Sequence, residues 1–239
     1  MRRAAHARFP EHLSPVAAVS SPDNELWLQC WRDRSTDFHQ KTVNPLLVRY
    51  WQSLNLPAKS RVFVPLCGKS LDLLWLAGQG HQVAGIELSP IAVRAFFREN
   101  RLHPVRRQVG RLTEWSSGQI RIFCGDIFAL TAADLGPVNA VYDRAALTAL
   151  PETTRIAYVA HLHALIPVMC PIFLVSAEDP EESDGTASEQ AIAEELLALY
   201  AGRFTVDLVH VVPSYQSDPE APEAPPQLVE HKLYRLLPI

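Results

Sequence analysis

The residues best suited to chemistry lie between positions 61 and 89, where a hydrophobic strand runs into a tight turn and a helix. The strand and turn read Val62-Phe-Val-Pro-Leu-Cys-Gly-Lys-Ser-Leu-Asp-Leu-Leu-Trp75, and a second strand ends at Glu87. Gly68 allows a ligand to approach the backbone closely, and Glu87, 19 residues later, can accept both hydroxyls of a ribose. This unit is expected to hold a ribose-bearing molecule beyond the carboxyl ends of the strands.

The glycine positions argue against two phosphate-binding motifs. A Walker A loop needs a glycine five positions before Gly68, where the chain has Phe63. The dinucleotide pattern G-x-G-x-x-G is also missing, because Gly78 and Gly80 lie at the wrong end of the helix. A nucleoside triphosphatase and a Rossmann-type oxidoreductase are therefore disfavoured. A ligand with ribose and adenine but no phosphate fits better, and S-adenosylmethionine is the common one.

The cysteines do not form a metal or disulfide site. Cys30, Cys67, Cys124 and Cys170 contain no C-x-x-C pair, and we expect no bound metal. Cys67 lies beside the turn, but no paired base accompanies it, so we expect no nucleophilic role. Free thiols fit the reducing cytoplasm, which is the expected location.

Length and charge limit the class of protein. The 239 residues, 48% of them hydrophobic, suit one domain, which we expect over residues 24–239 after a flexible arm over residues 1–23. A net charge of −4 argues against a nucleic-acid partner. No apolar run approaches the roughly 18 residues of a membrane span. We expect a monomer that acts on a small molecule.

The elements that must position these residues alternate between strand and helix. Strands are expected at residues 61–64, 82–88, 120–123, 138–142, 172–175, 204–212 and 231–237. Helices are expected at residues 25–31, 45–54, 70–77, 91–100, 151–165 and 188–200. Ser89-Pro90 gives the fourth helix an N-cap and a proline at its first position. The last two strands can pair antiparallel, since only the loop Ser214 to Gln227 separates them. The pattern predicts an α/β fold with a mainly parallel sheet flanked by helices.

Several segments, in this order, resemble the thiopurine S-methyltransferase family over residues 25–200. They are Trp27-x-x-x-Trp31 with Phe38-His39, Phe63-Val-Pro-Leu-Cys-Gly-Lys-Ser-Leu-Asp-Leu73, Val83-Ala-Gly-Ile-Glu-Leu-Ser89, Cys124-Gly-Asp-Ile-Phe128, Tyr142-Asp-Arg-Ala-Ala-Leu147 and Leu150-Pro-Glu-Thr-Thr-Arg-Ile-Ala-Tyr158. The resemblance implies a Rossmann-like class I methyltransferase with seven strands in the order 3-2-1-4-5-7-6.

The resemblance also implies which residues bind S-adenosylmethionine and release S-adenosylhomocysteine. The cofactor-binding set is Trp27, Trp31, Leu66, Gly68, Glu87, Asp126, Ile127 and Arg144. Phe38 and Arg144 would border the acceptor pocket. No residue is expected to act as a catalytic acid, base or nucleophile.

Each assignment has a structural alternative. Trp27 and Trp31, four residues apart on one helical face, could be a packing pair. Arg144 could hold the cofactor carboxylate or an anionic acceptor, or it could pair with Asp143 or Glu152. Glu87 could be a solvated strand end. Asp126 follows a glycine and also suits a turn, and we assign His39 no catalytic role.

The implied reaction is methyl transfer to a sulfur, or to selenium or tellurium, of a small molecule. An easily ionised thiol needs little help from a general base. After the fifth strand, however, the family usually has a tyrosine and then Gly-Pro-Pro-Phe. Here Glu178 to Ser188 keeps Gly185 but is rich in acidic residues. A more polar or cationic acceptor, or a non-catalytic relative that binds the cofactor, remains an alternative.

Overall fold

A computed structural model describes residues 22–178, 188–216, 223 and 225–239. The first helix, α1 (Pro22–Asp33), begins two residues before residue 24, where the domain is predicted to start. Residues 1–21 of the arm lie outside the described residues. Residues 179–187, which carry most of the acidic loop, lie outside them as well.

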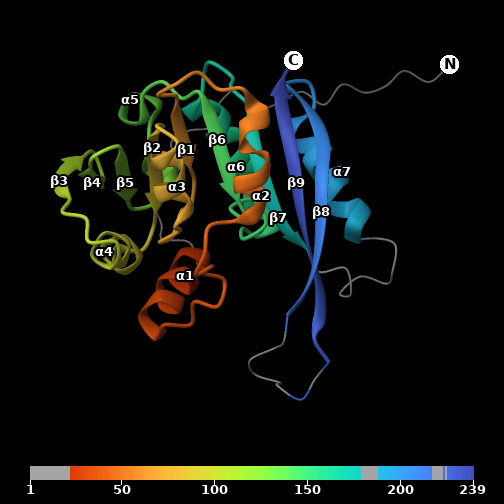
Figure 1. The fold of residues 1–239 in the computed structure, drawn as a ribbon, viewed down its shortest axis with the longest axis horizontal. Coiled ribbons are helices and arrows are strands. Elements are labelled where there is room, and N and C mark those ends of the chain that lie inside the picture. Colours follow the sequence, from red (N-terminus) through yellow and green to blue (C-terminus); the bar gives the residue numbers. More distant parts are fainter. Residues whose placement is uncertain (1–21, 179–187, 217–222, 224) are drawn as a thin grey trace.

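The described residues form one sheet with the strand order β3-β4-β5-β2-β1-β6-β7-β9-β8 (Figure 1). Its parallel centre consists of β5 (Ile120–Cys124), β2 (Gln82–Glu87), β1 (Arg61–Val64), β6 (Ala140–Arg144) and β7 (Ile172–Glu178). At one edge β9 (Gln227–Pro238) pairs antiparallel with both β7 and β8 (Phe204–Gln216), which confirms the expected antiparallel ending. These seven strands follow the order 3-2-1-4-5-7-6.

The expected count of seven strands is wrong, because a hairpin extends the other edge. β3 (Val105–Val109) pairs antiparallel with β4 (Leu112–Ser117), and β4 pairs antiparallel with β5. The sheet therefore has nine strands, and only four of its eight pairings are parallel. β3 was missed because its Val-Arg-Arg-Gln-Val sequence is largely exposed and shows no apolar alternation.

Helices cover both faces of the sheet (Figure 1). Apolar residues of α2 (Pro45–Tyr50), the 3₁₀ helix η1 (Trp51–Leu54), α3 (Asp72–Gly78) and α4 (Pro90–Glu99) form one core with the sheet. Apolar residues of α5 (Ala132–Leu135), α6 (Glu152–Leu165) and α7 (Ser188–Tyr200) form the other. The strands of the parallel centre thus bury both faces, as is typical of parallel sheets.

Local sequence fixes where the helices begin. Ser89 has extended backbone and its Oγ accepts a hydrogen bond from the Ala92 N–H, while Pro90 opens α4. The predicted cap is confirmed. Among the described residues, no helix is both long and apolar enough to cross a membrane.

Candidate cofactor and acceptor site

Glu87 lies at the end of β2, and its carboxylate closes the loop that follows β1. The Gly68 N–H donates to Glu87 Oε2 at 2.9 Å, and the Ser89 N–H donates to Oε1 at 2.7 Å. Glu87 is 6% exposed, so the alternative of a solvated strand end is wrong. Burial raises the pKa of Glu87 to about 7, against the opposing effect of the backbone donors. Each oxygen keeps a lone pair for a further donor.

The loop after β1 forms a close cradle beneath Trp31. Gly68 has φ +54°, and a Cβ added there would lie 3.5 Å from Cζ2 of the Trp31 indole. Leu66 also has a positive φ, +43°, which strains a residue with a side chain. The backbone turns sharply enough to direct the Gly68 N–H at Glu87, and Trp31, 6% exposed, covers the turn.

Three aromatic rings meet beside this cradle. Trp27 and Trp31 both contact Phe38 edge to face, with ring centroids 5.3 and 5.6 Å apart. Phe38 is 45% exposed, so one side of this cluster faces solvent. Trp27 and Trp31 therefore pack together with Phe38, which confirms the packing alternative. Trp31 also covers the Gly68 turn.

The loop after β5 contacts α1, which lies at the carboxyl ends of the parallel strands (Figure 1). Asp126 Oδ1 accepts the Phe128 N–H at 2.9 Å and so caps the 3₁₀ helix η2 (Ile127–Ala129). Its other oxygen accepts Asn24 Nδ2 of α1 at 3.0 Å. The turn role proposed as an alternative for Asp126 is thus present. The Ile127 side chain is 4% exposed and packs in the core, and its carbonyl lies 2.8 Å from His161 Nε2.

Arg144, at the end of β6, is held by Asp72 rather than by Asp143 or Glu152. Arg144 Nε lies 3.1 Å from Asp72 Oδ2, and the Asp72 side chain is 1% exposed. The same carboxylate accepts the Tyr142 hydroxyl and the Asn44 N–H, each at 2.8 Å. In the described part of the chain, neither terminal nitrogen of Arg144 has a partner. Both remain available to a ligand.

Asp143 has a separate structural task. Its carboxylate accepts the Tyr158 hydroxyl at 2.7 Å and the Ala146 N–H at 3.0 Å, and it is fully buried. Burial raises its pKa to about 6. It fixes the turn after β6, where Ala145 has φ +58°, and so sets the direction in which Arg144 leaves the sheet.

The sequence did not predict that Asp72 holds Arg144, although Asp72 lies within the Cys67-Gly-Lys-Ser-Leu-Asp72 segment. The available signal was a carboxylate at the first residue of a helix that directly follows the ligand-binding turn. Its role depends on Tyr142 and Asn44, which are 70 and 28 residues away in sequence. No local pattern predicts those contacts.

A small pocket lies between the loop after β1 and the end of β6, with two histidines and Lys69 near Arg144 at its border. Leu66, Cys67, Ser70, Tyr142 and Arg144 line it. Burial lowers the pKa of His39, and the charges of Lys69 and Arg144 lower it further. Burial and then Arg144 lower the pKa of His231 in the same direction. Both histidines are therefore neutral at pH 7, while Arg144 supplies a fixed positive charge.

The described residues contain no group of three or more His, Cys, Asp or Glu placed to hold a metal. Cys67 is buried, and burial followed by the nearby Glu87 raises the pKa of its thiol well above its ordinary value. A neutral, buried thiol is a poor nucleophile. The site thus offers binding and charge rather than covalent chemistry.

The donors and acceptors of this site match S-adenosylmethionine. Glu87 has free lone pairs that could accept two ribose hydroxyls, the Trp31 ring over Gly68 is of a kind that favours a nearby sulfonium cation, and Arg144 could bind a carboxylate. Asp126 and Ile127 lie at the end of β5, next to β2 in the sheet. Together with the sheet order, these features define a class I methyltransferase, which uses S-adenosylmethionine as its methyl donor.

Comparison with known proteins identifies the family. The family model of thiopurine S-methyltransferase matches residues 22–237. A thiopurine S-methyltransferase of Stutzerimonas stutzeri is 54% identical over 91% of this chain and 92% of its own length. One of Bordetella petrii is 42% identical over 90% and 98%. The chain belongs to the thiopurine S-methyltransferase family and is an S-adenosylmethionine-dependent methyltransferase.

Solved structures support the fold at low sequence identity. A protein from a study of the conversion of a disulfide bond into a thioacetal group during echinomycin biosynthesis has a TM-score of 0.65 and 18% identity. It covers 90% of this chain and 92% of its own. A methyltransferase from Anabaena variabilis has a TM-score of 0.60 and 13% identity, covering 96% and 100%.

Proposed function

We propose that this enzyme transfers the methyl group of S-adenosylmethionine to an ionised sulfur of a small molecule, a thiopurine or another thiol, or to a selenium or tellurium counterpart. One observation carries the choice of acceptor. Arg144 is fixed by the buried Asp72 through Nε, and its two terminal nitrogens remain available beside the cradle. A permanent cation held there stabilises an anionic acceptor more than a neutral or cationic one.

The cofactor-binding roles follow from the positions already described. In this proposal Glu87 binds both ribose hydroxyls, Gly68 and Leu66 form the floor below the methionine part, and Trp31 covers it. Asp126 and Ile127 border the adenine. Trp27 supports Phe38, which forms one wall of the acceptor pocket.

The reaction is an in-line displacement that needs alignment more than proton transfer. The acceptor anion supplies an electron pair to the methyl carbon, the bond from carbon to the sulfonium sulfur breaks, and that electron pair stays on the departing thioether. Positive charge disappears from the donor and negative charge from the acceptor. A dry, aromatic wall therefore favours the transition state over the separated ions.

The described residues near Arg144 include no strong general base, which is consistent with this acceptor class. Burial and nearby positive charge, including that of Arg144, lower the pKa values of His39 and His231, which makes both weaker bases. Arg144 instead lowers the pKa of a bound thiol, so that the acceptor arrives as a thiolate or becomes one in the pocket. Lys69 lies on the same side, although Glu99 pairs with it at 2.9 Å.

The competing hypothesis is the polar or cationic acceptor suggested by the acidic loop. Residues 179–187 of that loop are outside the described part of the chain, so only the sequence supports such an acceptor. Among the described residues, Asp72 pairs with Arg144 through Nε, and the two terminal nitrogens of Arg144 still favour an anion. We also propose that the enzyme acts as a monomer in the cytoplasm, with no nucleic-acid or membrane partner.

Turnover with matched acceptors tests the proposal. S-adenosylhomocysteine formation is measured with 6-thioguanine, with guanine as its oxygen counterpart, and with a selenol and a cationic aminothiol. We expect turnover with the thiopurine or the selenol and none with guanine. Preference for the cationic aminothiol would contradict the anionic acceptor, and no product from any acceptor despite cofactor binding would contradict chalcogen methylation.

Arg144→Gln separates the two roles of that side chain. Loss of a charge-assisted hydrogen bond of about 1.5–3 kcal/mol should raise the KM for the acceptor roughly tenfold or more. If Arg144 binds only the acceptor, the Kd for S-adenosylhomocysteine stays the same. If Arg144 holds the cofactor carboxylate instead, that Kd rises and the acceptor KM does not. Arg49→Gln, on the outer surface of α2, is the matched control.

A further inference from the structure

A second hollow lies at the opposite edge of the sheet from the cofactor site. It is formed where β1, β2 and β5 begin and where the turn between β4 and β5 passes them, and it has a volume of about 150 Å³. Its polar lining comes from Arg61, Gln82, Ser116, Gln119 and Arg121. No acidic side chain lines it among the described residues. We call this site the arginine hollow.

The fold leaves this part of the sheet uncovered. Side chains alternate along a strand, so Arg61 shares a face with Phe63, and Arg121 shares that face with Phe123. Phe63 and Phe123 are fully buried in the core beneath the helices. The helix α5, however, has only four residues and ends at Leu135. Beyond its end the strands carry arginines instead of apolar residues.

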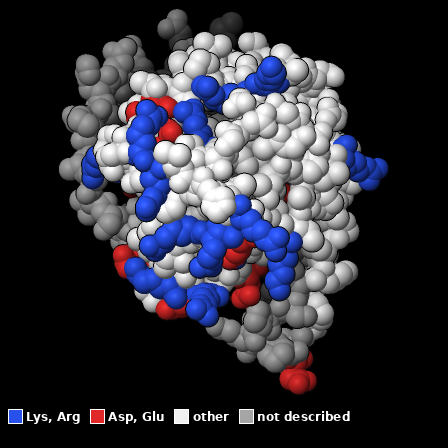
Figure 2. All heavy atoms as spheres, turned by 60° about the vertical axis from the view of Figure 1, so that its left-hand side comes forward, with Lys and Arg blue, Asp and Glu red and all other residues white. Residues whose placement is uncertain are grey.

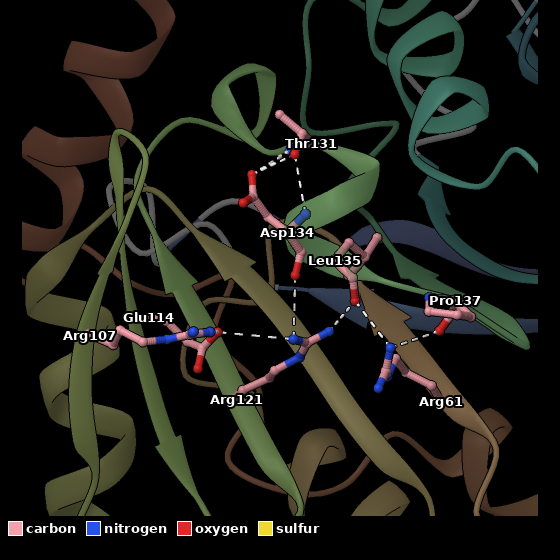
Figure 3. Close-up of polar contacts among 8 residues, drawn as sticks. All are labelled: Arg61, Arg107, Glu114, Arg121, Thr131, Asp134, Leu135 and Pro137. Carbon is pink, nitrogen blue, oxygen red and sulfur yellow. Dashed lines mark hydrogen bonds and ion pairs between the residues drawn. The ribbon is translucent and has the colours of Figure 1, made fainter.

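Arg61 and Arg121 are held side by side at the end of α5 (Figure 3). Both donate to the same carbonyl, that of Leu135, and Arg61 Nη1 also donates to Pro137 O at 3.2 Å. Gly136 makes this possible, since a Cβ there would lie 2.6 Å from Arg61 Nη1. Within the described ranges, Arg61 Nε and Nη2 donate to no protein group.

Positive charge exceeds negative charge around this pair. Arg107 Nη2 lies 2.9 Å from Glu114 Oε2, and Arg121 Nη1 lies 4.0 Å from the same oxygen. Glu114 is thus one carboxylate shared by two arginines, and Arg61 has none. The Asp134 carboxylate points away, toward Thr131, the N-cap of α5, whose hydroxyl donates to it at 2.6 Å (Figure 3).

The surroundings make this excess charge unfavourable when no anion is bound. Burial lowers the pKa of Arg121, and the neighbouring charges of Arg61 and Arg107 lower it too, against the effect of Glu114. The face that carries the β3–β4 hairpin shows many Lys and Arg side chains (Figure 2), although the whole chain has a net charge of −4. A bound anion would relieve this repulsion.

We propose that the arginine hollow binds a small multivalent phosphate, such as a phosphomonoester or pyrophosphate, through Arg61 and Arg121. Nε and Nη2 of Arg61 form a pair of parallel donors that matches two phosphate oxygens. Arg121, whose Nη1 and Nη2 donate to Asp134 O and Leu135 O, adds its positive charge beside them. The volume of about 150 Å³ equals that of about five water molecules at about 30 Å³ each. Gln82, Gln119 and Ser116 add neutral donors.

This site is independent of the proposed methyl transfer. It lies at the amino ends of the strands, whereas Gly68, Glu87 and Arg144 lie at their carboxyl ends. Its test is therefore a binding measurement that does not depend on activity. Loss of phosphate binding would leave the methyltransferase assignment unchanged.

Calorimetry with inorganic phosphate and with pyrophosphate tests the proposal on the full chain at 0.15 M salt. We expect one site per chain, with pyrophosphate bound more tightly. Arg61→Gln and Arg121→Gln should each weaken binding at least tenfold. Arg111→Gln, in the turn of the same hairpin but outside the hollow, should change it less than twofold.

Glu114→Gln gives a result that misfolding cannot produce. It removes the carboxylate that Arg107 and Arg121 share while keeping the shape, so pyrophosphate should bind at least threefold more tightly. No binding of either anion at millimolar concentration would overturn the proposal. So would equal losses in Arg61→Gln and Arg111→Gln, or binding of duplex RNA alone with a steep salt dependence, which would indicate a diffuse basic surface.

Discussion

Replacing Glu87 with glutamine should change how stability depends on pH, because the carboxyl group is buried without a cation. Burial raises its pKa from 4.5 to about 7 in the folded chain. Between these values the folded chain binds more protons than the unfolded chain, so the free energy of unfolding falls as pH rises. At 1.36 kcal/mol per pKa unit, the raised pKa of Glu87 lowers the free energy of unfolding by about 0.8 kcal/mol at pH 5 and by about 3.3 kcal/mol at pH 8.

The glutamine side chain in Glu87→Gln does not ionise. The loss of a hydrogen bond from the Gly68 or Ser89 N–H lowers the variant's free energy of unfolding equally at every pH. The free energy of unfolding of Glu87→Gln relative to wild type should therefore rise by about 2.5 kcal/mol between pH 5 and pH 8. Urea unfolding of both proteins at each pH measures this difference. Glu99→Gln, an exposed control on α4, should change by less than about 0.5 kcal/mol. A parallel pH dependence of wild type and Glu87→Gln would show that the pKa of Glu87 is not raised in the folded chain.

The same pKa should appear in cofactor binding. Only the ionised carboxylate of Glu87 can accept hydrogen bonds from both ribose hydroxyls. S-adenosylhomocysteine should therefore bind about tenfold more weakly at pH 6 than at pH 8, and its binding should release protons near pH 7. Calorimetry in two buffers of different ionisation enthalpy detects the released protons. A pH-independent Kd in the wild type would contradict the assignment of the ribose to Glu87.

Three further predictions concern the loop and the residues that support it. In urea unfolding, Asp72→Asn should lower the free energy of unfolding by about 3 kcal/mol, because it breaks the buried ion pair with Arg144. The control Asp207→Asn, at the exposed ion pair with Arg235, should lower it by less than about 0.5 kcal/mol. Gly68→Ala should destabilise by about 1–2 kcal/mol because of its positive φ and weaken S-adenosylhomocysteine at least tenfold in calorimetry. Ser89→Ala should lower the free energy of unfolding by about 1 kcal/mol through loss of the cap, measured in the same way. Equal effects of the two aspartate variants, unchanged ligand affinity in Gly68→Ala, or no loss in Ser89→Ala would contradict these assignments.

Features that depend on local chemistry were predictable from sequence. The cap Ser89-Pro90, the Gly68 turn and the carboxylate at the end of β2 each follow from a residue type at a fixed position. The order of seven strands came from the family resemblance and agrees with the pairing of the sheet.

Features that depend on distant partners were not predictable. Arg144 pairs with Asp72 because β6 and the start of α3 meet in space, while its neighbour Asp143 turns into the opposite core to meet Tyr158. The hairpin β3–β4 has one sequence signal, the two-residue turn Gly110-Arg111 between Val109 and Leu112. The exposed arginines of β3 interrupt the alternation of apolar and polar residues that predicts a strand.

A crystal structure of the complex with S-adenosylhomocysteine would show where the cofactor binds. We expect both ribose hydroxyls within hydrogen-bond distance of the Glu87 carboxylate, the amino-acid part over Gly68 beneath Trp31, and the adenine beside Asp126 and Ile127. A ribose bound away from Glu87, or an amino-acid part outside the Trp31 cradle, would contradict this binding mode.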